Sequence, residues 1–382
     1  MGAPARRTDL ASALLAATPR RRSPRHYNGH VDNDRDTAAP RGPAAWADER
    51  LRELHRRYRR LFWTVHSVWA LATGVAVLIL AHHRHGYLPW VVLFLALTWA
   101  STLFFSRFAP EPVSPAGRFA QSFVSYLTRV MYQETLFFLL PFYAYSTTLW
   151  SVNASYTGLL AVLAVLSCLD LPFDRLLRTS QAFALAFFFL VTFSALQLVL
   201  PLLLRLPIYL SAELAAAAAF VGAVPLVEAP GRTRGRRLAV LCLGFLAALV
   251  GVRFLLPLIP PVPLRLGSVQ FATRIDPERA TAERPLGSTV SLTELTGDQL
   301  YAVVTVRSPS PQRTTLTILF SRDGTRLRRS QPITTTAHDL GIWVWDALPA
   351  PAFGFLPGTY TVEVRTAEGQ LVGRKALRLV SG

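Results

Sequence analysis

The sequence is almost devoid of lysine and has very little cysteine. Of its 40 basic residues only Lys375 is a lysine, which excludes mechanisms that need a Schiff-base or P-loop lysine. The two cysteines, Cys168 and Cys242, both lie in apolar runs, where they are typical of small buried residues. Neither a disulfide framework nor a zinc site of the cysteine type is therefore expected.

Charge is scarce in the middle of the chain. Only 16% of the 382 residues are charged, and the formal net charge is +17. Residues 61–260 hold 12 basic and 6 acidic residues, whereas the much shorter segment 261–382 holds 14 and 10. This uneven distribution is not typical of a soluble globular protein and predicts a membrane-embedded middle segment.

Long apolar runs occur throughout this middle segment. A transmembrane helix needs about 20 mostly apolar residues to cross about 30 Å of hydrocarbon. The runs that meet this condition are 61–81, 89–107, 133–150, 156–173, 181–203, 207–227 and 238–259. We therefore expect an α-helical polytopic membrane domain of about seven transmembrane helices at 61–260.

The arginines between these runs predict an orientation. If the N-terminus is cytoplasmic, the outer connections carry only Arg84 and Arg205. The inner connections then carry the other loop arginines, namely Arg107, Arg118, Arg129, Arg175, Arg178, Arg232, Arg234, Arg236 and Arg237. Because positive residues accumulate on the cytoplasmic side, we expect a multi-pass protein of the bacterial inner membrane with residues 261–382 in the periplasm.

The N-terminal 60 residues are predicted to lie in the cytoplasm. Residues 1–45 are rich in Arg, Pro and Ala without an apolar period, so we expect a disordered arm. Residues 46–60 combine an apolar face with several arginines, which indicates an amphipathic helix that contacts anionic lipid headgroups or only sets the topology. A nucleic-acid partner is not expected, because no binding fold accompanies the charge.

Four ionisable residues near the predicted spans are candidate intramembrane polar sites, because charges there are costly. Glu134 and Asp170 are expected near the cytoplasmic surface, where they either form a polar pocket or contact water. Glu213 and Arg253 are expected at similar depth, where a structural ion pair is favoured over a transport role.

Clustered histidines provide the only hint of a metal site. His82, His83 and His85 lie in the first predicted outer loop, but no further ligand can be identified, so a solvated loop is favoured over a site for zinc or copper. No catalytic residue, metal or cofactor is therefore predicted.

Beyond residue 260 the spacing of apolar residues changes from the three to four residues of a helix to the two residues of a strand. Every second residue is apolar in two segments. These residues are Leu300, Ala302, Val304 and Val306 in the first segment and Tyr360, Val362 and Val364 in the second. Several short strands in 261–382 predict an all-β sandwich of immunoglobulin-like type.

Trp343 and Trp345 lie on one face of a predicted strand. If this face points outward, the rings are candidates for stacking on a sugar or a peptide. If it points inward, both are core residues, which the apolar neighbours Ile342 and Val344 favour.

Two segments carry a family resemblance. The first is Gln133-Glu134 followed by Phe137, Phe138, Leu140, Pro141 and Phe142, and the second is Pro357-Gly358-Thr359-Tyr360-Thr361-Val362-Glu363-Val364 followed by Gly369, Leu371, Gly373 and Arg374. With these segments the chain resembles an uncharacterised bacterial family of multi-pass inner-membrane proteins with a C-terminal all-β domain of unknown function. The resemblance implies the architecture and no activity or site residue.

Together these features predict a non-enzymatic envelope anchor. Its periplasmic sandwich would present a binding module for an envelope protein or a glycan. The alternative is a transporter or a lipid- or glycan-modifying membrane enzyme with a site between helices near Glu134 and Asp170.

Overall fold

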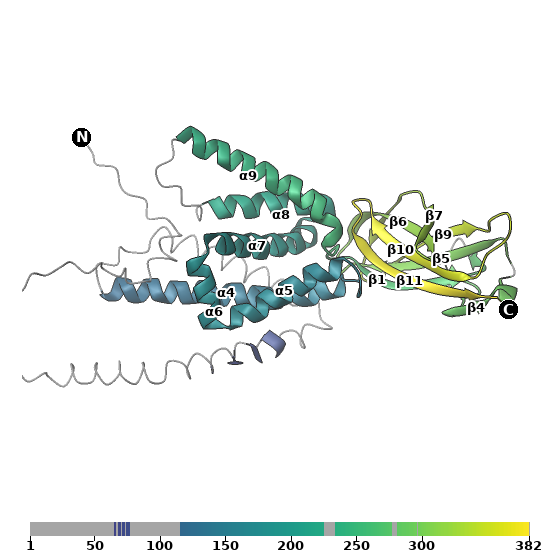
Figure 1. Ribbon diagram of the computed structural model, residues 1–382, viewed down its shortest axis with the longest axis horizontal. Coiled ribbons are helices and arrows are strands. Elements are labelled where there is room, and N and C mark those ends of the chain that lie inside the picture. Colours follow the sequence, from purple (N-terminus) through teal and green to yellow (C-terminus); the bar gives the residue numbers. More distant parts are fainter. Residues whose placement is uncertain are drawn as a thin grey trace, which may run out of the picture.

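The chain forms a helical part and a strand domain that lie end to end (Figure 1). The computed structural model describes residues 115–224, 234–276, 281–295 and 297–381, with a few positions between 65 and 76. The helices of the helical part are α4 (Pro115–Tyr145), α5 (Asn153–Cys168), α6 (Asp170–Thr179), α7 (Gln181–Leu204), α8 (Ile208–Ala223) and α9 (Arg234–Leu255), with the 3-10 turn η3 (Leu256–Leu258).

Local sequence determines where several of these helices begin and end. The Ser180 side chain accepts a hydrogen bond from the backbone N–H of Phe183 at 3.2 Å and so caps the N-terminus of α7. Helix α7 ends at Leu204, because the next residue, Arg205, adopts a left-handed conformation with φ of 55°. Pro207 then precedes α8. These turns produce a tight α7–α8 hairpin.

The core of the helical part is formed mainly by α4, α5, α7 and α8, with Phe173 of α6 and Val252 of α9. Buried leucine and phenylalanine side chains such as Leu136, Phe137, Leu160 and Leu198 form one cluster. Helix α8 contributes only alanines to it, namely Ala212, Ala215, Ala216 and Ala219, all with no exposed surface. Small side chains allow α7 and α8 to approach closely, as the helix pair requires.

The strand domain follows η3 and contains two packed sheets. Its elements are β1 (Arg265–Ala272), β2 (Ile275–Asp276), β3 (Thr281–Ala282), β4 (Thr289–Ser291), η4 (Leu292–Glu294), β5 (Gln299–Arg307), β6 (Gln312–Arg322), β7 (Thr325–Arg329), β8 (Ile333–Ala337), β9 (Ile342–Pro349), β10 (Gly358–Thr366) and β11 (Leu371–Val380). Of the two packed sheets, the smaller has the order β1-β5-β9, and the larger has the order β4-β11-β10-β6-β7, with β8 also paired to β6. Strands β2 and β3 form a separate two-stranded sheet.

Alternating side chains of the two sheets form the core of the strand domain. Leu300 and Val304 of β5 are buried against Ile318 of β6 and Val362 of β10. Ile208, the first residue of α8, belongs to the same cluster, so the helical part contributes directly to the core of the strand domain. Residues at period two therefore point alternately into this core and out of it.

The predicted fold class, seven transmembrane helices with an immunoglobulin-like sandwich, is wrong. Within the described residues only two helices are long and apolar enough to cross a membrane, Gln181–Leu204 and Ala239–Leu258. The remainder is a mixed helical and sheet fold. The predicted spans 61–81, apart from a few positions, and 89–107, together with the arm 1–45 and the helix 46–60, lie outside the described residues.

Helix breaks explain the difference, because composition alone does not reveal them. Helices α5 and α8 have 16 residues each and reach only about 24 Å, which is shorter than the hydrocarbon core. The run 156–173 is interrupted at Leu169, where α5 gives way to α6. Conversely, α4 begins at Pro115 and continues without a break through Gln133 and Glu134, where a new span was expected to begin.

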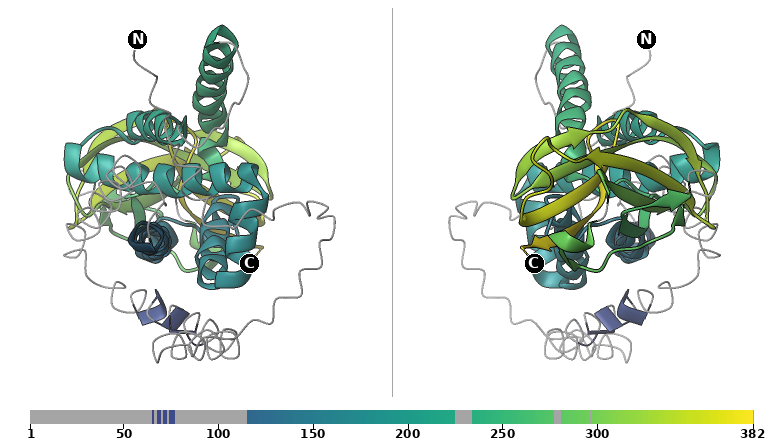
Figure 2. Two further views of the ribbon diagram at one scale, coloured as in Figure 1. Left: turned by 90° about the vertical axis from the view of Figure 1, so that its left-hand side faces the viewer. Right: turned by 90° about the vertical axis from the view of Figure 1, so that its right-hand side faces the viewer.

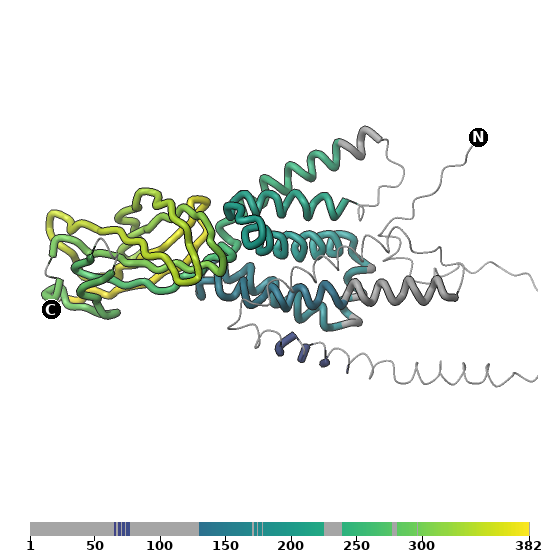
Figure 3. Tube along the Cα trace, turned by 180° about the vertical axis from the view of Figure 1, so that it is seen from behind, coloured from purple at the N-terminus to yellow at the C-terminus, as the bar shows by residue number. Residues whose placement is uncertain are grey.

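Buried amide side chains join the helical part to the strand domain. Asn153 Nδ2 donates to the carbonyl oxygen of Leu371 at 3.0 Å, and Gln370 Nε2 donates to that of Ile259 at 3.0 Å. Gln312 Nε2 donates to the carbonyl oxygen of Leu206 at 2.6 Å. These three amides, here called the junction amides, are almost fully buried and hold the strand domain against the helical part. Figure 3 shows the strand domain at the end of the helices.

Candidate functional site

Glu134 and Asp170 lie on different helices. Glu134 is half-buried in the second half of α4, and Asp170 is the first residue of α6. The side chain of Asp170 lies outside the described part of the chain. A shared polar pocket between these two carboxylates therefore stays a prediction.

The structure brings Glu213 and Arg253 together. Arg253 Nη1 of α9 donates to Glu213 Oε1 of α8 at 3.2 Å. The Arg253 side chain is 79% exposed and the Glu213 side chain is 36% exposed, so the pair lies at the surface of the helical part. This geometry suits an ion pair that ties α9 to α8 near the strand domain.

A buried polar cluster, which the sequence did not reveal, lies between α4, α5 and α7. Tyr143 Oη donates to the carbonyl oxygen of Ser194 and to Gln197 Oε1, each at 3.0 Å. The Tyr156 hydroxyl lies 2.7 Å from Ser194 Oγ. Gln197 Nε2 is buried and has no hydrogen-bond partner in the described part of the chain. The only sequence signal was a glutamine inside the apolar run 181–203.

Trp343 and Trp345 point outward from β9, the edge strand of the smaller sheet. Their residues are 44% and 36% exposed, whereas Val344 between them is 5% exposed. The interpretation as core residues is therefore wrong for both tryptophans. They remain candidates for ligand stacking, because their ring faces are accessible.

Tyr301 joins the two tryptophans through strand pairing. Trp345 lies opposite Val303 of β5, and Tyr301 is two residues earlier on the same face. The rings of Tyr301 and Trp345 meet edge to face, with centroids 6.1 Å apart. We call these three aromatic side chains the aromatic platform. The sequence did not predict Tyr301 as a member, because the pairing of β5 with β9 is long-range.

The aromatic platform can bind a flat apolar surface but carries no reactive group. The outer face of the smaller sheet also contains Ser268 Oγ and Thr305 Oγ1, which lie 3.0 Å apart between β1 and β5. Thr305 is only 3% exposed and its hydroxyl is paired with that of Ser268, so the aromatic rings are the accessible part of this face. Exposed aromatic rings are suited to a ligand with apolar faces, such as a sugar ring. The platform therefore supports binding, not covalent chemistry.

A metal site does not emerge from the described ranges. In them no group of three or more His, Cys, Asp or Glu side chains could hold a metal ion. The cluster of His82, His83 and His85 lies outside the described residues. The solvated loop expected there stays a prediction.

Comparison with solved structures provides a weak likeness. The alkylpurine DNA glycosylase AlkC of Pseudomonas fluorescens, bound to DNA containing an abasic site analog, is 11% identical and matches with a TM-score of 0.22. The match covers 84% of this chain and 98% of that chain. A TM-score this low does not show a common fold.

Comparison at the level of sequence identifies a family and no individual relative. No curated protein matches the chain. A family model matches residues 44–302, which include the helical part and the first strands of the strand domain. The match therefore crosses the boundary predicted at residue 260. The chain belongs to DUF5924, a family of unknown function.

Proposed function

We propose that this protein is an integral protein of the bacterial inner membrane that presents its strand domain in the periplasm as a non-enzymatic binding module. The observation that carries the proposal is the exposed apolar surface of α9. Only 11% of the most apolar stretch of this helix is buried, against 50% for α7. A core helix of a soluble protein is mostly buried, and α9 lies far from the N-terminus, so it is not a signal sequence.

The exposed surface of α9 is one continuous face. Leu243, Leu246, Val250 and Phe254 are 69%, 57%, 45% and 81% exposed, and their spacing of three and four residues places them on one side of the helix. Figure 2 shows one end of α9 projecting beyond the other helices, although Phe245 of α9 still contacts Phe220 of α8. Such a large apolar face is unfavourable in water and favourable in lipid.

Other helices of the helical part expose apolar side chains as well. Leu159, Val162 and Val165 of α5 are about half exposed, as are Leu214 and Val221 of α8. The strand domain exposes many arginine, threonine and glutamate side chains, and its most exposed large apolar residues, Leu340 and Phe353, lie singly in loops. Lipid around the helices and water around the strand domain account for this contrast.

The aromatic platform supports the role as a binding module. Tyr301, Trp343 and Trp345 form an accessible face on the smaller sheet. The junction amides hold the strand domain at the end of the helices through β6 and β11 of the larger sheet, which packs against this smaller sheet. Envelope glycans present sugar rings that stack on such faces. We therefore propose a glycan of the envelope as the ligand of the module.

The membrane proposal is tested by fractionation of cells that express the full chain. The protein is expected in the membrane fraction and is expected to stay there after an alkaline carbonate wash, which removes peripheral proteins. Recovery in the soluble fraction, or release by carbonate, would contradict the proposal.

The binding proposal is tested by co-sedimentation of the detergent-solubilised full chain with purified peptidoglycan. Each aromatic ring is expected to contribute about 0.5–1.5 kcal/mol, so Trp343→Ala and Trp345→Ala should each weaken binding by up to about tenfold. Phe353→Ala is the matched control, because Phe353 is an aromatic residue of the same domain that is 93% exposed and lies outside the platform. Equal binding by all variants, or no binding by the unmodified chain, would refute glycan stacking.

A further inference from the structure

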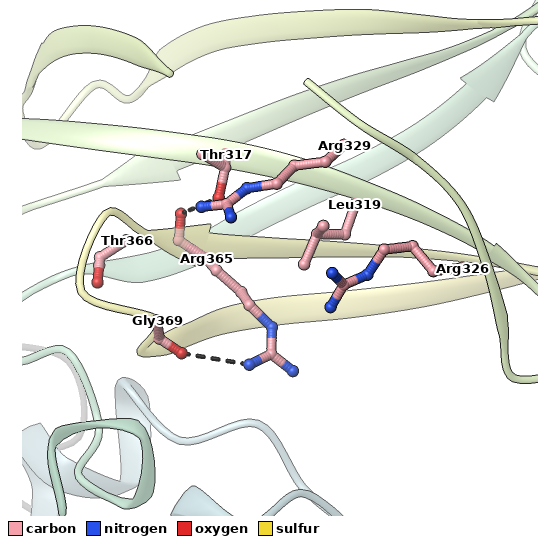
Figure 4. A pocket seen from close by; sticks show the side chains of 7 residues that line it. All are labelled: Thr317, Leu319, Arg326, Arg329, Arg365, Thr366 and Gly369. Atoms are coloured by element: carbon pink, nitrogen blue, oxygen red, sulfur yellow. Dashed lines mark hydrogen bonds between the residues drawn. The ribbon is translucent and has the colours of Figure 1, made fainter. Parts of the chain in front are cut away.

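A pocket lined by three arginines lies on the outer face of the larger sheet. Its volume is about 150 Å³, and its lining residues are Thr317, Leu319, Arg326, Arg329, Arg365, Thr366 and Gly369. Figure 4 shows Arg326 and Arg365 extending over the same hollow, with Arg329 on its far side. The arginines come from β7 and β10, which are separated by β6.

Strand register explains why these side chains converge. Arg329 lies opposite Leu319 of β6, and Arg365 lies opposite Thr317. Leu319 and Thr317 are two residues apart and share the outer face of β6. An irregularity between Phe320 and Ser321 shifts the register, so that Arg326 lies opposite Ser321 on this same face.

The three guanidinium groups differ in what they contact. Arg365 is held in place, because its Nε and Nη2 donate to Glu363 Oε2 at 3.0 and 2.8 Å and its Nη1 donates to the carbonyl oxygen of Gly369 at 3.3 Å. Arg326 and Arg329 form no ion pair with any other described residue. Glu368 lies in the turn next to Gly369, so it is a second carboxylate near the pocket besides Glu363.

Positive charge extends beyond the pocket on this face. Arg374 of β11 lies opposite Glu363, and Arg378 lies opposite Thr359 on the same strand pair. Both arginines are exposed. The outer face of the larger sheet therefore carries more guanidinium groups than carboxylates, which favours the approach of an anion.

We propose that Arg326, Arg329 and Arg365 form a binding site for a phosphate group. Guanidinium groups donate two parallel hydrogen bonds to oxyanions such as phosphate, and a lysine cannot replace this geometry. Arg365 is preorganised by Glu363, and the unpaired Arg326 and Arg329 supply the donors that close on the ligand. The pocket volume accommodates one phosphate group and not a large organic ligand.

The position of the pocket indicates two sources of phosphate. The turn at Gly369 faces η3, which directly follows α9, since a Cβ atom on this glycine would lie 3.8 Å from Pro257 Cγ, and Gln370 donates to the carbonyl oxygen of Ile259. If the helices are embedded in a bilayer, a lipid headgroup can reach the pocket. A soluble phosphate compound can reach it in either case, so phosphate binding does not depend on the membrane proposal.

The experiment uses the full chain in neutral detergent and measures binding of inorganic phosphate by isothermal titration calorimetry. Removal of one charge-assisted contact is expected to weaken binding by about tenfold or more, so Arg326→Gln and Arg329→Gln should each do so. Arg329→Lys, which keeps the charge but loses the planar fork, should also bind less tightly. Arg378→Gln is the matched control, because it removes an exposed arginine of the same sheet outside the pocket.

A second arm of the experiment measures how far a ligand protects the three arginines from modification by phenylglyoxal, using peptide mass spectrometry. The ligand is inorganic phosphate in one sample, and in the other the protein is placed in nanodiscs that contain phosphatidylglycerol. Protection by inorganic phosphate would assign a soluble ligand, and protection only in anionic nanodiscs would assign a lipid headgroup. Either result supports the site. The proposal is overturned if neither probe protects these arginines, or if Arg378→Gln weakens binding as much as the pocket variants.

Discussion

At the scale of single residues, the environment of the Asp346 carboxylate predicts how the stability of the strand domain depends on pH. Its Oδ1 lies 3.4 Å from Arg328 Nη2, and this contact links β9 of the smaller sheet to β7 of the larger. Its Oδ2 is buried without a hydrogen-bond partner among the described residues. Burial raises the pKa of the Asp346 carboxyl above its usual range, and the backbone N–H of Ala347 and the Arg328 guanidinium lower it by less.

The raised pKa predicts the sign of a pH effect. The folded state binds the Asp346 proton more tightly than the unfolded state, whose aspartate pKa is about 3.9. Asp346 therefore stabilises the folded state when the pH is below the unfolded-state pKa. This stabilisation is lost as the pH rises through the raised pKa of the folded state. At neutral pH, Asp346→Asn should leave the unfolding midpoint of the strand domain unchanged or higher, measured by thermal denaturation across pH. Asp298→Asn, at an exposed site, is the control, and a lower midpoint for Asp346→Asn alone would contradict the prediction.

Tyr143 provides a second test at this scale. Its hydroxyl group donates to two acceptors in the apolar core of the helical part. Tyr143→Phe should lower the free energy of unfolding by about 1–3 kcal/mol, because Gln197 Oε1 then loses a partner in a region that water does not reach. The measurement is thermal unfolding in detergent. Tyr209→Phe, at a residue that is 45% exposed, should have little effect.

At the scale of secondary-structure elements, the exposed apolar face of α9 provides a test of the membrane proposal. Leu246 lies near the middle of the stretch Ala239–Leu258 and is 57% exposed. Arginine near the centre of a transmembrane helix costs about 2.5–3.5 kcal/mol, so Leu246→Arg should reduce the amount of protein in the membrane fraction. Leu356→Arg introduces the same charge at a 45%-exposed site of the strand domain and should not. Equal losses for both variants would indicate general instability.

The connection between the two parts of the chain is also an element-scale property. Asn153→Ala and Gln370→Ala each remove a buried hydrogen bond to a backbone carbonyl group across the junction. Each should lower the free energy of unfolding by about 1–3 kcal/mol, and limited proteolysis should cut between α9 and β1 more readily. Gln331→Ala, at an exposed position outside the junction, provides the comparison. Unchanged proteolysis in both junction variants would show that apolar packing alone holds the strand domain.

At the scale of the whole molecule, the proposed topology places the arm and the strand domain on opposite sides of the inner membrane. The native cysteines are first replaced by Cys168→Ala and Cys242→Ser, and Phe353→Cys or Ser23→Cys is then added. In cells with a permeabilised outer membrane, a membrane-impermeant maleimide should label the cysteine at position 353 and not the one at position 23. The reverse pattern would overturn the orientation that the arginines predict.

The sequence was a better guide to local pattern than to the extent of each element. The alternation of Tyr360, Val362 and Val364 corresponds to the buried face of β10. In contrast, the apolar run that contains α5 was expected to be one span, but the chain turns at Leu169. Composition averages over such a break, whereas helix length depends on where the backbone hydrogen bonds end.

The candidate site shows the same division. Pairing of Glu213 with Arg253 was expected from their depth, and the two side chains do meet. The outward direction of Trp343 and Trp345 was not expected, because both faces of β9 are apolar in sequence. Which face is covered depends on the packing of the larger sheet, and this packing joins segments far apart in the chain.

The sequence by itself determined the apolar character of the middle segment, the strands after residue 260 and the scarcity of reactive groups, because these depend on composition and short periods. Only the tertiary structure decided which helices are long enough to cross a membrane, how the junction amides hold the strand domain, and that Arg326, Arg329 and Arg365 line one pocket. These features depend on long-range pairing and on helix ends. The register of β6 with β7 and β10 brings the three arginines together.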